Sequence, residues 1–534
     1  MAHGPTRRQD LQDRWPCNEP MTAKTLRKFW MVMCFGLVQV AQAQGFNRHY
    51  DAFSSEFDQG AFGIEPTGLD WMIFSVSYEP DTVTPDSILG IHTIILQKID
   101  AQGELLAEKK FKIPQHGAYL GWANCCDTLA GGGFVSGGSI ENLDGSSEVE
   151  LVRYSPQGDT LWTRTFGDAS HFWIGSQVKQ TPDEGFLVCG YTDATGNTDG
   201  FVLKTDSAGN ELWRHTYGAG SVSDDYSCIT LVPDGYVLSG RSHLSADNFD
   251  FWVTKIDTSG TLQWDIRFGS PYKEPSPSIL YLQDGRLLLG GGWGTDPFYF
   301  ETPYVVFIDP ANGDTLYSRK YGATDYITTI FVSKQFPDSD IIHAGVSYVG
   351  GPEQGLLLRT TSDGDSIWMR NYFYYDDDVE QGQGRFFDVL PTADNGCIAT
   401  GFANGPVNVP LPPGHSQDTW VVKVDSMGCV VPGCDGIVGI TEVATNLGDA
   451  LHLYPNPVRE QLHVGISLPH GFKTTGPLTL SVTSLEGKLV QQVAVPTSAA
   501  GEVVLDVSGL ASGMYALHLS DAQRWLAGTK FVVE

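Results

Sequence analysis

Residues that could do chemistry recur in this chain at one position of a repeated pattern and do not gather at a single point. A basic residue stands two positions before a turn in six strand-like segments, at Lys98, Arg153, Lys204, Lys255, Arg359 and Lys423. An acidic residue often precedes such a segment, as at Asp199, Asp250 and Asp418. A catalytic group is needed once per site, whereas an ion pair that stabilises a repeated unit is needed in every unit. We therefore predict that these charges stabilise the fold, and we identify no catalytic residue.

The balance of charge limits the kind of partner. The 534 residues include 33 Lys and Arg against 63 Asp and Glu, a formal net charge of −30. Such a surface repels phosphate backbones, so nucleic acid is not expected as a partner. Paired carboxylates can hydrolyse a glycosidic bond, but no pair stands out among so many acids. No spacing typical of a metal site is present, and we predict no cofactor.

A repeat is marked by the phrase Asp-x-x-Gly followed by an aromatic residue. Clear copies occupy 206–213 and 257–264, and weaker copies end at Trp162, Tyr317 and Trp368, with successive aromatic residues 51, 51, 53 and 51 positions apart. Each period holds four short runs of apolar and β-branched residues separated by turn sequences. Seven such periods predict an all-β fold, a seven-bladed β-propeller of four-stranded blades over 44–428. An elongated solenoid is the alternative, although its repeats are usually shorter.

The two ends of this region predict how the ring closes. The seventh period supplies three runs, the last at 420–424, and then departs into a Cys-Val-Val-Pro-Gly-Cys segment. Phe46–Tyr50 matches the missing fourth run. A blade built from both ends of the region leaves no exposed first or last edge strand.

These periods resemble the Trp-containing repeats of quinoprotein-type propellers and, more closely, the Gly/Asp/Trp-rich repeats of exported Bacteroidetes proteins. The resemblance implies the fold and says little about activity, because propellers host many unrelated functions. The turn phrase is similar to the Asp-box of sialidases, but its spacing differs and no Arg cluster accompanies it. The adjacent Cys125 and Cys126 are similar to the vicinal pair of quinoprotein dehydrogenases, but two buried thiols that pack as small apolar residues are the simpler interpretation.

Loops that depart from the repeat predict where a ligand could bind. In an antiparallel meander, the loops between second and third strands and the connections between blades emerge on one face of the ring. Aromatic residues gather in these loops, at Trp293, Phe298, Tyr299, Phe300, Tyr374 and Tyr375, with more at 116–122 and 171–173. Because loops on a rigid scaffold often carry binding residues, we predict a platform for a glycan or a peptide here. The alternative is that the rings only cap the blades.

The N-terminal segment predicts export. Residues 24–28 are basic, 29–40 are apolar, and Ala41-Gln42-Ala43 has the small-x-small form of a cleavage site. We expect a signal peptide at 21–43 after an upstream extension at 1–20, with translation starting at Met21. An apolar run of twelve is too short to span a bilayer, so no transmembrane segment is expected in the mature chain.

The cysteines fit an exported protein. Seven of the nine lie beyond the predicted cleavage point, and an odd number leaves at least one thiol outside any internal disulfide. Cys429 and Cys434 flank a Val-Val-Pro-Gly turn and are the best candidates for a disulfide.

A different pattern follows a linker at 429–450. Short alternating strands over 451–534 predict a small β-sandwich. Its distinctive residues form a Tyr-Pro-Asn-Pro opening, a Gly-Met-Tyr run and a terminal Lys, at Tyr454, Pro455, Asn456, Pro457, Gly513, Met514, Tyr515 and Lys530. They resemble the type A C-terminal sorting domain of type IX secretion substrates. The resemblance implies export by that machinery across both membranes, removal of the domain, and attachment to surface polysaccharide or release. An ordinary sandwich domain is the alternative.

The chain is therefore expected to be an exported propeller protein, secreted or held on the outer-membrane exterior. The predicted function is non-enzymatic ligand binding or adhesion, with a glycan, a peptide or surface polysaccharide as the ligand. The alternative is an exported propeller enzyme, either a glycoside hydrolase or a quinone-dependent oxidoreductase. A cluster of His, Asp, Glu or Arg in the central channel would favour the enzyme.

Overall fold

The chain forms strands throughout the part that the structure, a computed structural model, describes. It describes residues 45–534 except for 53–58, 81–89, 113–115, 143–144, 169, 219, 221, 246–247, 276, 297–299, 323–325, 350–352, 374–382, 405–416, 435–449, 469–473, 475, 485–487, 496–499 and 522–524. The predicted upstream extension and signal peptide lie outside the described residues.

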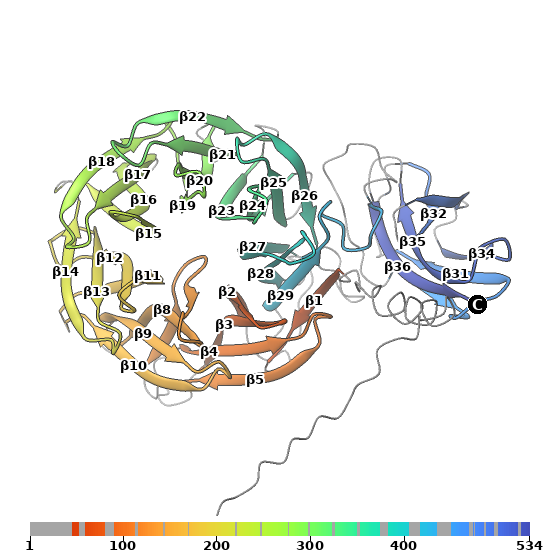
Figure 1. Cartoon of the computed structure of the whole chain (residues 1–534), viewed down its shortest axis with the longest axis horizontal. Helices are drawn as coiled ribbons and strands as arrows, with labels where there is room; N and C mark the ends of the chain where they lie inside the picture. Colours follow the sequence, from red (N-terminus) through yellow and green to blue (C-terminus); the bar gives the residue numbers. More distant parts are fainter. Residues whose placement is uncertain are drawn as a thin grey trace, which may run out of the picture. The chain divides into compact units, whose positions relative to one another are not determined.

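Six antiparallel sheets follow one another round a ring (Figure 1), each with its first strand innermost. Blade 1 holds β2 (Gln59–Thr67), β3 (Asp70–Pro80), β4 (Gly90–Ile99) and β5 (Leu105–Phe111); blade 2 holds β6 (Gly117–Leu120), β7 (Cys126–Thr128), β8 (Phe134–Glu141), β9 (Ser147–Tyr154) and β10 (Thr160–Phe166); blade 3 holds β11 (Trp173–Gln180), β12 (Phe186–Thr192), β13 (Asp199–Thr205) and β14 (Glu211–Tyr217). Blade 4 holds β15 (Ser223–Val232), β16 (Gly235–Ser245), β17 (Asn248–Ile256) and β18 (Leu262–Phe268); blade 5 holds β19 (Ser278–Tyr281), β20 (Leu287–Gly294), β21 (Glu301–Ile308) and β22 (Thr315–Lys320); blade 6 holds β23 (Thr328–Gln335), β24 (Ile341–Ser347), β25 (Gln354–Thr360) and β26 (Ser366–Tyr372).

Blade 7 closes the ring with strands from both ends of the region. Its strands are β27 (Gln383–Pro391), β28 (Cys397–Asn404), β29 (Gln417–Val424) and β1 (Phe46–Tyr50). Strand β1 pairs antiparallel with β29, so that Phe46 lies opposite Lys423. The Trp420 indole N–H also donates to the Asn47 side chain at 2.6 Å. The predicted seven blades and their closure are confirmed.

The repeated basic residues form ion pairs, as predicted. Five of the six bond an aspartate at the turn between the first two strands of their own blade, with N–O distances of 2.9 Å for Lys204–Asp183, 2.8 Å for Lys255–Asp234 and 2.6 Å for Lys423–Asp394. The exception, Arg153, donates to the Ser207 carbonyl of the next blade. The lysine side chains are buried, at 3% exposed for Lys204 and 2% for Lys423. Because a buried ammonium without a partner is costly, these pairs fix the first turn of the blades that contain them.

The turn glycines explain why an aromatic residue recurs. Gly209 has φ +78°, and a Cβ built on it would lie 2.9 Å from the Trp162 ring of the preceding blade. Gly260 stands in the same relation to Trp213, at 3.1 Å. The regular spacing of turn and ring within the repeat therefore packs each blade against its neighbour.

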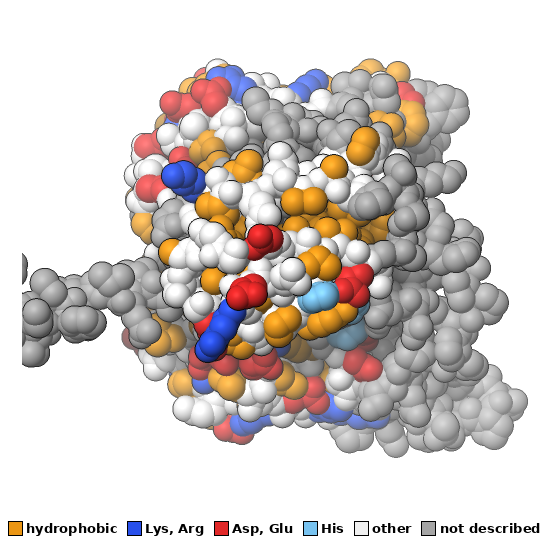
Figure 2. All heavy atoms as spheres, turned by 90° about the vertical axis from the view of Figure 1, so that its right-hand side faces the viewer, with side chains coloured by type: hydrophobic (Ala, Val, Ile, Leu, Met, Phe, Trp, Pro, Cys, Tyr) orange, Lys and Arg blue, Asp and Glu red, His pale blue; other side chains and the backbone are white. Residues whose placement is uncertain are grey.

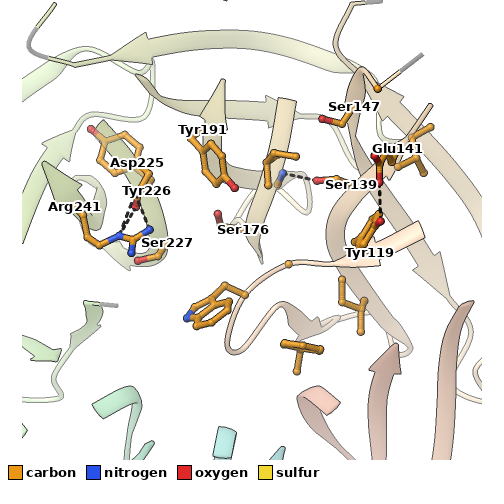
Figure 3. Close-up of a pocket in the computed structure, with 18 residues that line it drawn as sticks. Tyr119, Ser139, Glu141, Ser147, Ser176, Tyr191, Asp225, Tyr226, Ser227 and Arg241 are labelled. Atoms are coloured by element: carbon orange, nitrogen blue, oxygen red, sulfur yellow. Dashed lines mark hydrogen bonds and ion pairs between the residues drawn. The ribbon is translucent and has the colours of Figure 1, made fainter. Parts of the chain in front are cut away.

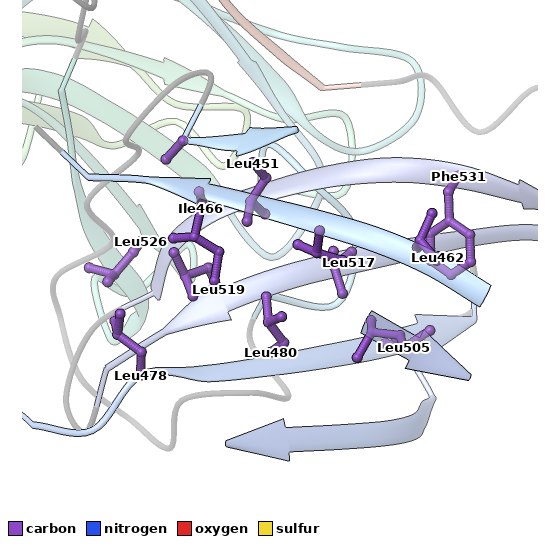
Figure 4. Packing of buried hydrophobic residues seen from close by; sticks show 14 of the residues in the cluster. Leu451, Leu462, Ile466, Leu478, Leu480, Leu505, Leu517, Leu519, Leu526 and Phe531 are labelled. Carbon is purple, nitrogen blue, oxygen red and sulfur yellow. The ribbon is translucent and has the colours of Figure 1, made fainter. Parts of the chain in front are cut away.

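The C-terminal residues form two facing sheets. One contains β30 (Leu451–Tyr454), β31 (Gln461–Ser467) and β34 (Ala500–Asp506), and the other contains β33 (Leu489–Ala494), β32 (Thr479–Ser484), β35 (Gly513–Ser520) and β36 (Trp525–Val533). Buried side chains from both sheets fill the space between them, including Leu462, Leu480, Leu517 and Phe531 (Figure 4). The predicted sandwich is confirmed.

Hydrophobic and acidic side chains are intermixed on the side of the molecule that Figure 2 shows, with few Lys or Arg among them. Within the described part of the chain, no helix has the length and apolar character needed to span a membrane.

Candidate functional site

A β-bulge in the innermost strand directs side chains toward the ring axis. The strand register shifts at one position in blades 1, 3, 4, 6 and 7, where two residues of the inner strand oppose one of the next. The bulged residues are Phe62, Ser176, Ser227, Phe331 and Phe387. Bulges re-aim side chains, so the size of these five residues decides which parts of the centre are filled.

Blade 2 has a larger irregularity at the same level. Its inner strand is interrupted between β6 and β7, and the intervening segment contains Trp122 (Figure 1 shows this orange stretch projecting into the ring). The Trp122 ring centroid lies 5.1 Å from that of Phe387 and 6.0 Å from that of Phe331. Phe387 also stacks on Phe62 at 4.7 Å. Rings from blades 1, 2, 6 and 7 thus form one aromatic layer at the axis.

The interrupting segment is held from both sides. Asn124 accepts a hydrogen bond on its backbone oxygen from Gln177 at 3.0 Å, and on its side-chain oxygen from Lys334 at 2.9 Å. Its φ of 55° is rare outside glycine, and Asn tolerates it better than most residues. The bonds to blades 3 and 6 fix the position of Trp122.

A cluster of charged side chains lies beyond the aromatic layer, three residues further along several inner strands. It contains Glu65, Asp127, Lys179, Lys334 and Asp388. Lys179 lies 3.3 Å from Asp127, while Asp388 accepts the Ile64 and Val389 backbone N–H groups at 3.1 and 2.9 Å. Burial raises the pKa of Glu65 to about 7, against the attraction of Lys334 and Lys179. Such a cluster is the feature that would favour an enzyme, but its members are bonded to one another, to the backbone or to neighbouring side chains: Glu65 accepts the Thr128 hydroxyl, and Lys334 donates to Asn124.

A cavity of about 700 Å³ opens on the other side of the aromatic layer (Figure 3). Its walls come from the end of β6 with the segment that follows, from the first halves of β11 and β15 and from the second halves of β8, β12 and β16. These strand ends lie on the face where ligand binding was predicted. Side chains that line it include Phe62, Tyr119, Trp122, Ser139, Glu141, Ser176, Tyr191, Ser227 and Arg241. We call this cavity the funnel pocket.

One end of the funnel pocket is formed by Arg241 and Asp225. The Arg241 Nε and Nη2 atoms donate to Asp225 Oδ2 at 3.1 and 2.9 Å, and the His243 Nε2 atom lies 2.9 Å from the same oxygen. Burial alone would raise the pKa of Asp225, but the charge of Arg241 and the hydrogen bonds of Arg241 and His243 outweigh it and hold the pKa below its ordinary value. Asp225 is therefore an ionised carboxylate that fixes the guanidinium.

The opposite end is formed by Glu141 and Tyr119. The Tyr119 hydroxyl donates to Glu141 Oε2 at 2.7 Å, and the Tyr119 ring lies 3.9 Å from that of His92. Burial lowers the pKa of His92 to about 4, against the attraction of Glu141, so His92 is neutral at pH 7. This end of the pocket carries negative charge.

Hydroxyl groups and a half-buried tyrosine line the middle. Ser139 accepts the Gly175 N–H at 3.0 Å, and Ser227 donates to the Pro277 carbonyl at 2.9 Å. Burial raises the pKa of Tyr191, so its hydroxyl stays protonated at neutral pH. The pocket combines aromatic surface, small hydroxyls, the Arg241 guanidinium and the carboxylates of Asp225 and Glu141, and a few polar groups on a mostly apolar wall are the usual composition of a small-molecule site.

Of the aromatic residues predicted for the ligand face, the structure describes Trp293 and Phe300, and neither lines the funnel pocket. Trp293 is half-buried, packs on Tyr304 at 4.7 Å and has the Lys320 ammonium 4.2 Å above its ring. Phe300 is 37% exposed, and Phe298, Tyr299, Tyr374 and Tyr375 lie outside the described residues. Trp293 thus has the packing of a blade-capping ring, the alternative considered for it.

Sequence reasoning placed Tyr119 and Trp122 on this face but missed Ser139, Ser176, Tyr191 and Arg241. These residues lie in regular blades, where the repeat gave no reason to separate them from packing positions. The sequence contained one signal for the position of the pocket: Gly121–Cys125 interrupts the run of residues that forms the inner strand of the second blade. Among the described residues, no group of three or more His, Cys, Asp or Glu could hold a metal ion.

The distinctive C-terminal residues divide into structural and exposed ones. Asn456 accepts the Val532 N–H at 2.9 Å, and Tyr515 stacks on Phe531 at 5.8 Å and donates to the Ala511 carbonyl at 2.9 Å. Tyr454 and Met514 are exposed, and Tyr454 bonds Glu502 at 2.7 Å. The other members of the motif are Pro455 and Pro457, which are exposed, Gly513, which is extended, and Lys530, which is half-buried.

The cysteines fall into two groups. Cys429 and Cys434 form a disulfide, the pairing selected from the sequence. Cys125, at the end of the segment that carries Trp122, and Cys126, at the start of β7, are free and buried, with their sulfurs 3.5 Å apart. Cys189, Cys228 and Cys397 are also free and buried.

Residues 452–534 match the family described as the secretion system C-terminal sorting domain. This match indicates that the protein is exported, that it is secreted or displayed at the cell surface, and that its C-terminal part interacts with the secretion machinery.

Other proteins are similar to this chain over only part of its length or at low sequence identity. The regulatory protein FlaEY of Caulobacter vibrioides is 28% identical over 281 residues, which cover 43% of this chain and 28% of that protein's length. A protein of unknown function from Dyadobacter fermentans has 12% identity and a TM-score of 0.38, covering 71% of this chain and 98% of its own. The β-propeller domain of the Trilobed protease from Pyrococcus furiosus has 8% identity and a TM-score of 0.38, covering 68% and 93%.

Proposed function

We propose that this protein is an exported binding protein whose ligand occupies the funnel pocket. The observation that carries the proposal is a cavity of about 700 Å³ in which aromatic rings, serine hydroxyls, one guanidinium and two carboxylates converge, the polar groups all from blades 2, 3 and 4. Most of these groups lie on strands of a closed ring, and Trp122 lies in a segment fixed by the hydrogen bonds of Asn124, so they are positioned before any ligand arrives.

The carboxylates of the pocket support binding over catalysis. A glycoside hydrolase needs one carboxyl group whose pKa is raised so that it can donate a proton. Asp225 has a lowered pKa and two strong partners, and Glu141 accepts the Tyr119 hydroxyl. Groups held in this way suit the orientation of a ligand. The charged cluster around Glu65 is separated from the pocket by the aromatic layer.

The loops that hold Trp293, Phe298, Tyr299, Phe300, Tyr374 and Tyr375 remain a proposed extension of this binding face. In the sequence these residues stand at the end of the second strand of blade 5, in the loop after it and in the connection from blade 6 to blade 7, and in this proposal the loops face the same side of the ring as the pocket. A polymeric ligand that enters the pocket at one end would continue across them.

Delivery is proposed to follow the type IX route of Bacteroidetes. In this proposal the signal peptide at 21–43 directs export, the propeller at 44–428 is the functional domain, and the sandwich at 451–534, after a linker at 429–450, is a type A sorting domain. The mature protein then lies outside the outer membrane. Deleting 451–534 should leave a folded propeller in the periplasm, and normal surface delivery of that variant in cell fractionation would refute the route.

The binding function is tested with Trp122, which is 38% exposed and contributes to the pocket floor. The mature protein is screened against oligosaccharide and peptide arrays, and the titration of any ligand found is repeated with Trp122→Ala. Losing a stacked ring should weaken binding by about 1–3 kcal/mol. The matched control is Leu212→Ala, since Leu212 is 57% exposed on the outer strand β14. Equal affinity of the Trp122 variant and the wild type would exclude this pocket.

A further inference from the structure

We propose that the funnel pocket binds a carbohydrate segment with a single carboxylate group, which lies at Arg241 while sugar hydroxyls donate to Glu141. The inference rests on the proposed binding function and names the chemical class of its ligand.

At the Arg241 end, one edge of the guanidinium, formed by Nε and Nη2, is already bonded to Asp225. The Asp225 side chain is 8% exposed and the Arg241 side chain 32%. Asp225 uses the Nε and Nη2 atoms of Arg241, and no described residue accepts from Nη1. The remaining N–H groups are therefore available to donate to an acceptor on a ligand. Guanidinium groups bind carboxylates more strongly than neutral acceptors.

The Glu141 end requires the opposite chemistry. One carboxylate oxygen accepts the Tyr119 hydroxyl, and the carboxylate lies beside a histidine that is neutral at pH 7. A second carboxylate on the ligand would be repelled at this end. Hydroxyl groups of a sugar donate to carboxylates without adding charge, so a neutral sugar fits here.

The middle of the pocket favours sugar rings. Tyr191 and Trp122 supply aromatic surface, and four serines line the walls, at positions 139, 147, 176 and 227. A pyranose ring has an apolar C–H face and a rim of hydroxyls, so it satisfies both kinds of wall at once. The two polar ends shown in Figure 3 lie on opposite sides of this middle section.

The charge of the whole protein limits the ligand to few carboxylates. With a net charge of −30, the protein repels a polyanion at long range. At physiological ionic strength this repulsion is screened beyond about 8 Å. A single carboxylate near Arg241 is attracted locally, whereas acids on every sugar would meet Glu141 and the acidic surface.

The test compares five probes with the mature protein by calorimetric titration. They are a neutral trisaccharide, the same trisaccharide ending in glucuronic acid, the methyl ester of that acid, a polyuronate of equal length and an acidic peptide of similar mass. The acid should bind at least tenfold more tightly than its ester, and the polyuronate no more tightly than the acid. Glu141→Gln should weaken acid and ester by a similar factor, and Arg241→Gln should remove the difference between them.

Controls keep the outcomes distinct. Arg319→Gln changes an arginine that is 40% exposed on the outer strand β22 and should alter nothing. If Arg241→Gln fails to fold because Asp225 loses its partner, the ratio of acid to ester on the wild type still decides. Equal binding of acid and ester, or tighter binding of the polyuronate or peptide, overturns the inference and leaves the binding function standing. If none of the five probes binds, the carbohydrate assignment is overturned, and the Trp122 test against the wider arrays judges the binding function separately.

Discussion

Two halves of the ring use one backbone feature for opposite purposes. At the bulge of the inner strand, blades 3 and 4 place Ser176 and Ser227, whereas blades 6 and 7 place Phe331 and Phe387. The phenylalanines pack into the aromatic layer at the axis, while the serines leave room for the funnel pocket. Side-chain volume at this shared position therefore decides which half of the ring is packed at the axis and which half leaves space for the funnel pocket.

The largest expected effect comes from removing a ring of the filled half. Phe387 is 2% exposed and contacts Phe62, Trp122, Phe331 and Phe402. Phe387→Ala should lower the free energy of unfolding by about 3–5 kcal/mol, because it leaves a cavity among rings that cannot collapse. Denaturant titration measures this change. The control Leu316→Ala, at a residue 47% exposed, should change stability by less than about 0.5 kcal/mol. A similarly small loss for Phe387→Ala would mean that the aromatic layer is not a core.

The stability of the propeller should depend on pH through buried carboxyl groups on both sides of the ring, one in blade 2 and one in blade 5. Burial raises the pKa of Glu150 in blade 2 to about 8, and burial, with repulsion from Glu274, raises the pKa of Glu301 in blade 5 to about 8. A carboxyl with a raised folded-state pKa binds more protons folded than unfolded, so stability falls as pH rises from about 5 to about 8. Glu150→Gln should match the wild type at pH 5 and unfold at a higher temperature at pH 8.5. Glu301→Gln should do the same. Thermal melts that show no gain at pH 8.5 for either variant would contradict the account.

A smaller difference in stability is expected between variants that lack the ion pair of blade 7 and variants that lack the ion pair of blade 3. Asp394 is 25% exposed beside Lys423, whereas Asp183 is 59% exposed beside Lys204. Lys423→Met leaves a half-buried carboxylate without its partner and should cost about 1–3 kcal/mol. Lys204→Met leaves a well-solvated carboxylate and should cost about 1 kcal/mol or less. Equal losses in chemical denaturation would show that exposure of the acid does not govern the strength of these pairs.

The fold was predictable because the residues that define a blade repeat along the chain. The spacing of Trp162, Trp213 and Trp264 gives the length of one blade. Phe46–Tyr50 could be recognised as an outer strand from its residue pattern, although it lies far in the sequence from the blade that it completes. The location of the pocket was not predictable in the same way. Ser176 and Ser227 are common strand residues, and only the three-dimensional bulge turns them toward the axis. The exposed aromatic loops gave a stronger sequence signal, yet Trp293 packs on Tyr304.

The central claim is that the funnel pocket, which Ser176 lines, is the ligand site. The most direct test is calorimetric titration of the mature protein and of Ser176→Phe with a ligand found on the arrays, because this substitution gives blade 3 the residue of blade 6. The account predicts that the phenylalanine fills the pocket and weakens binding at least a hundredfold, while the melting temperature shows that the ring stays folded. Unchanged affinity in a folded Ser176→Phe protein would contradict it.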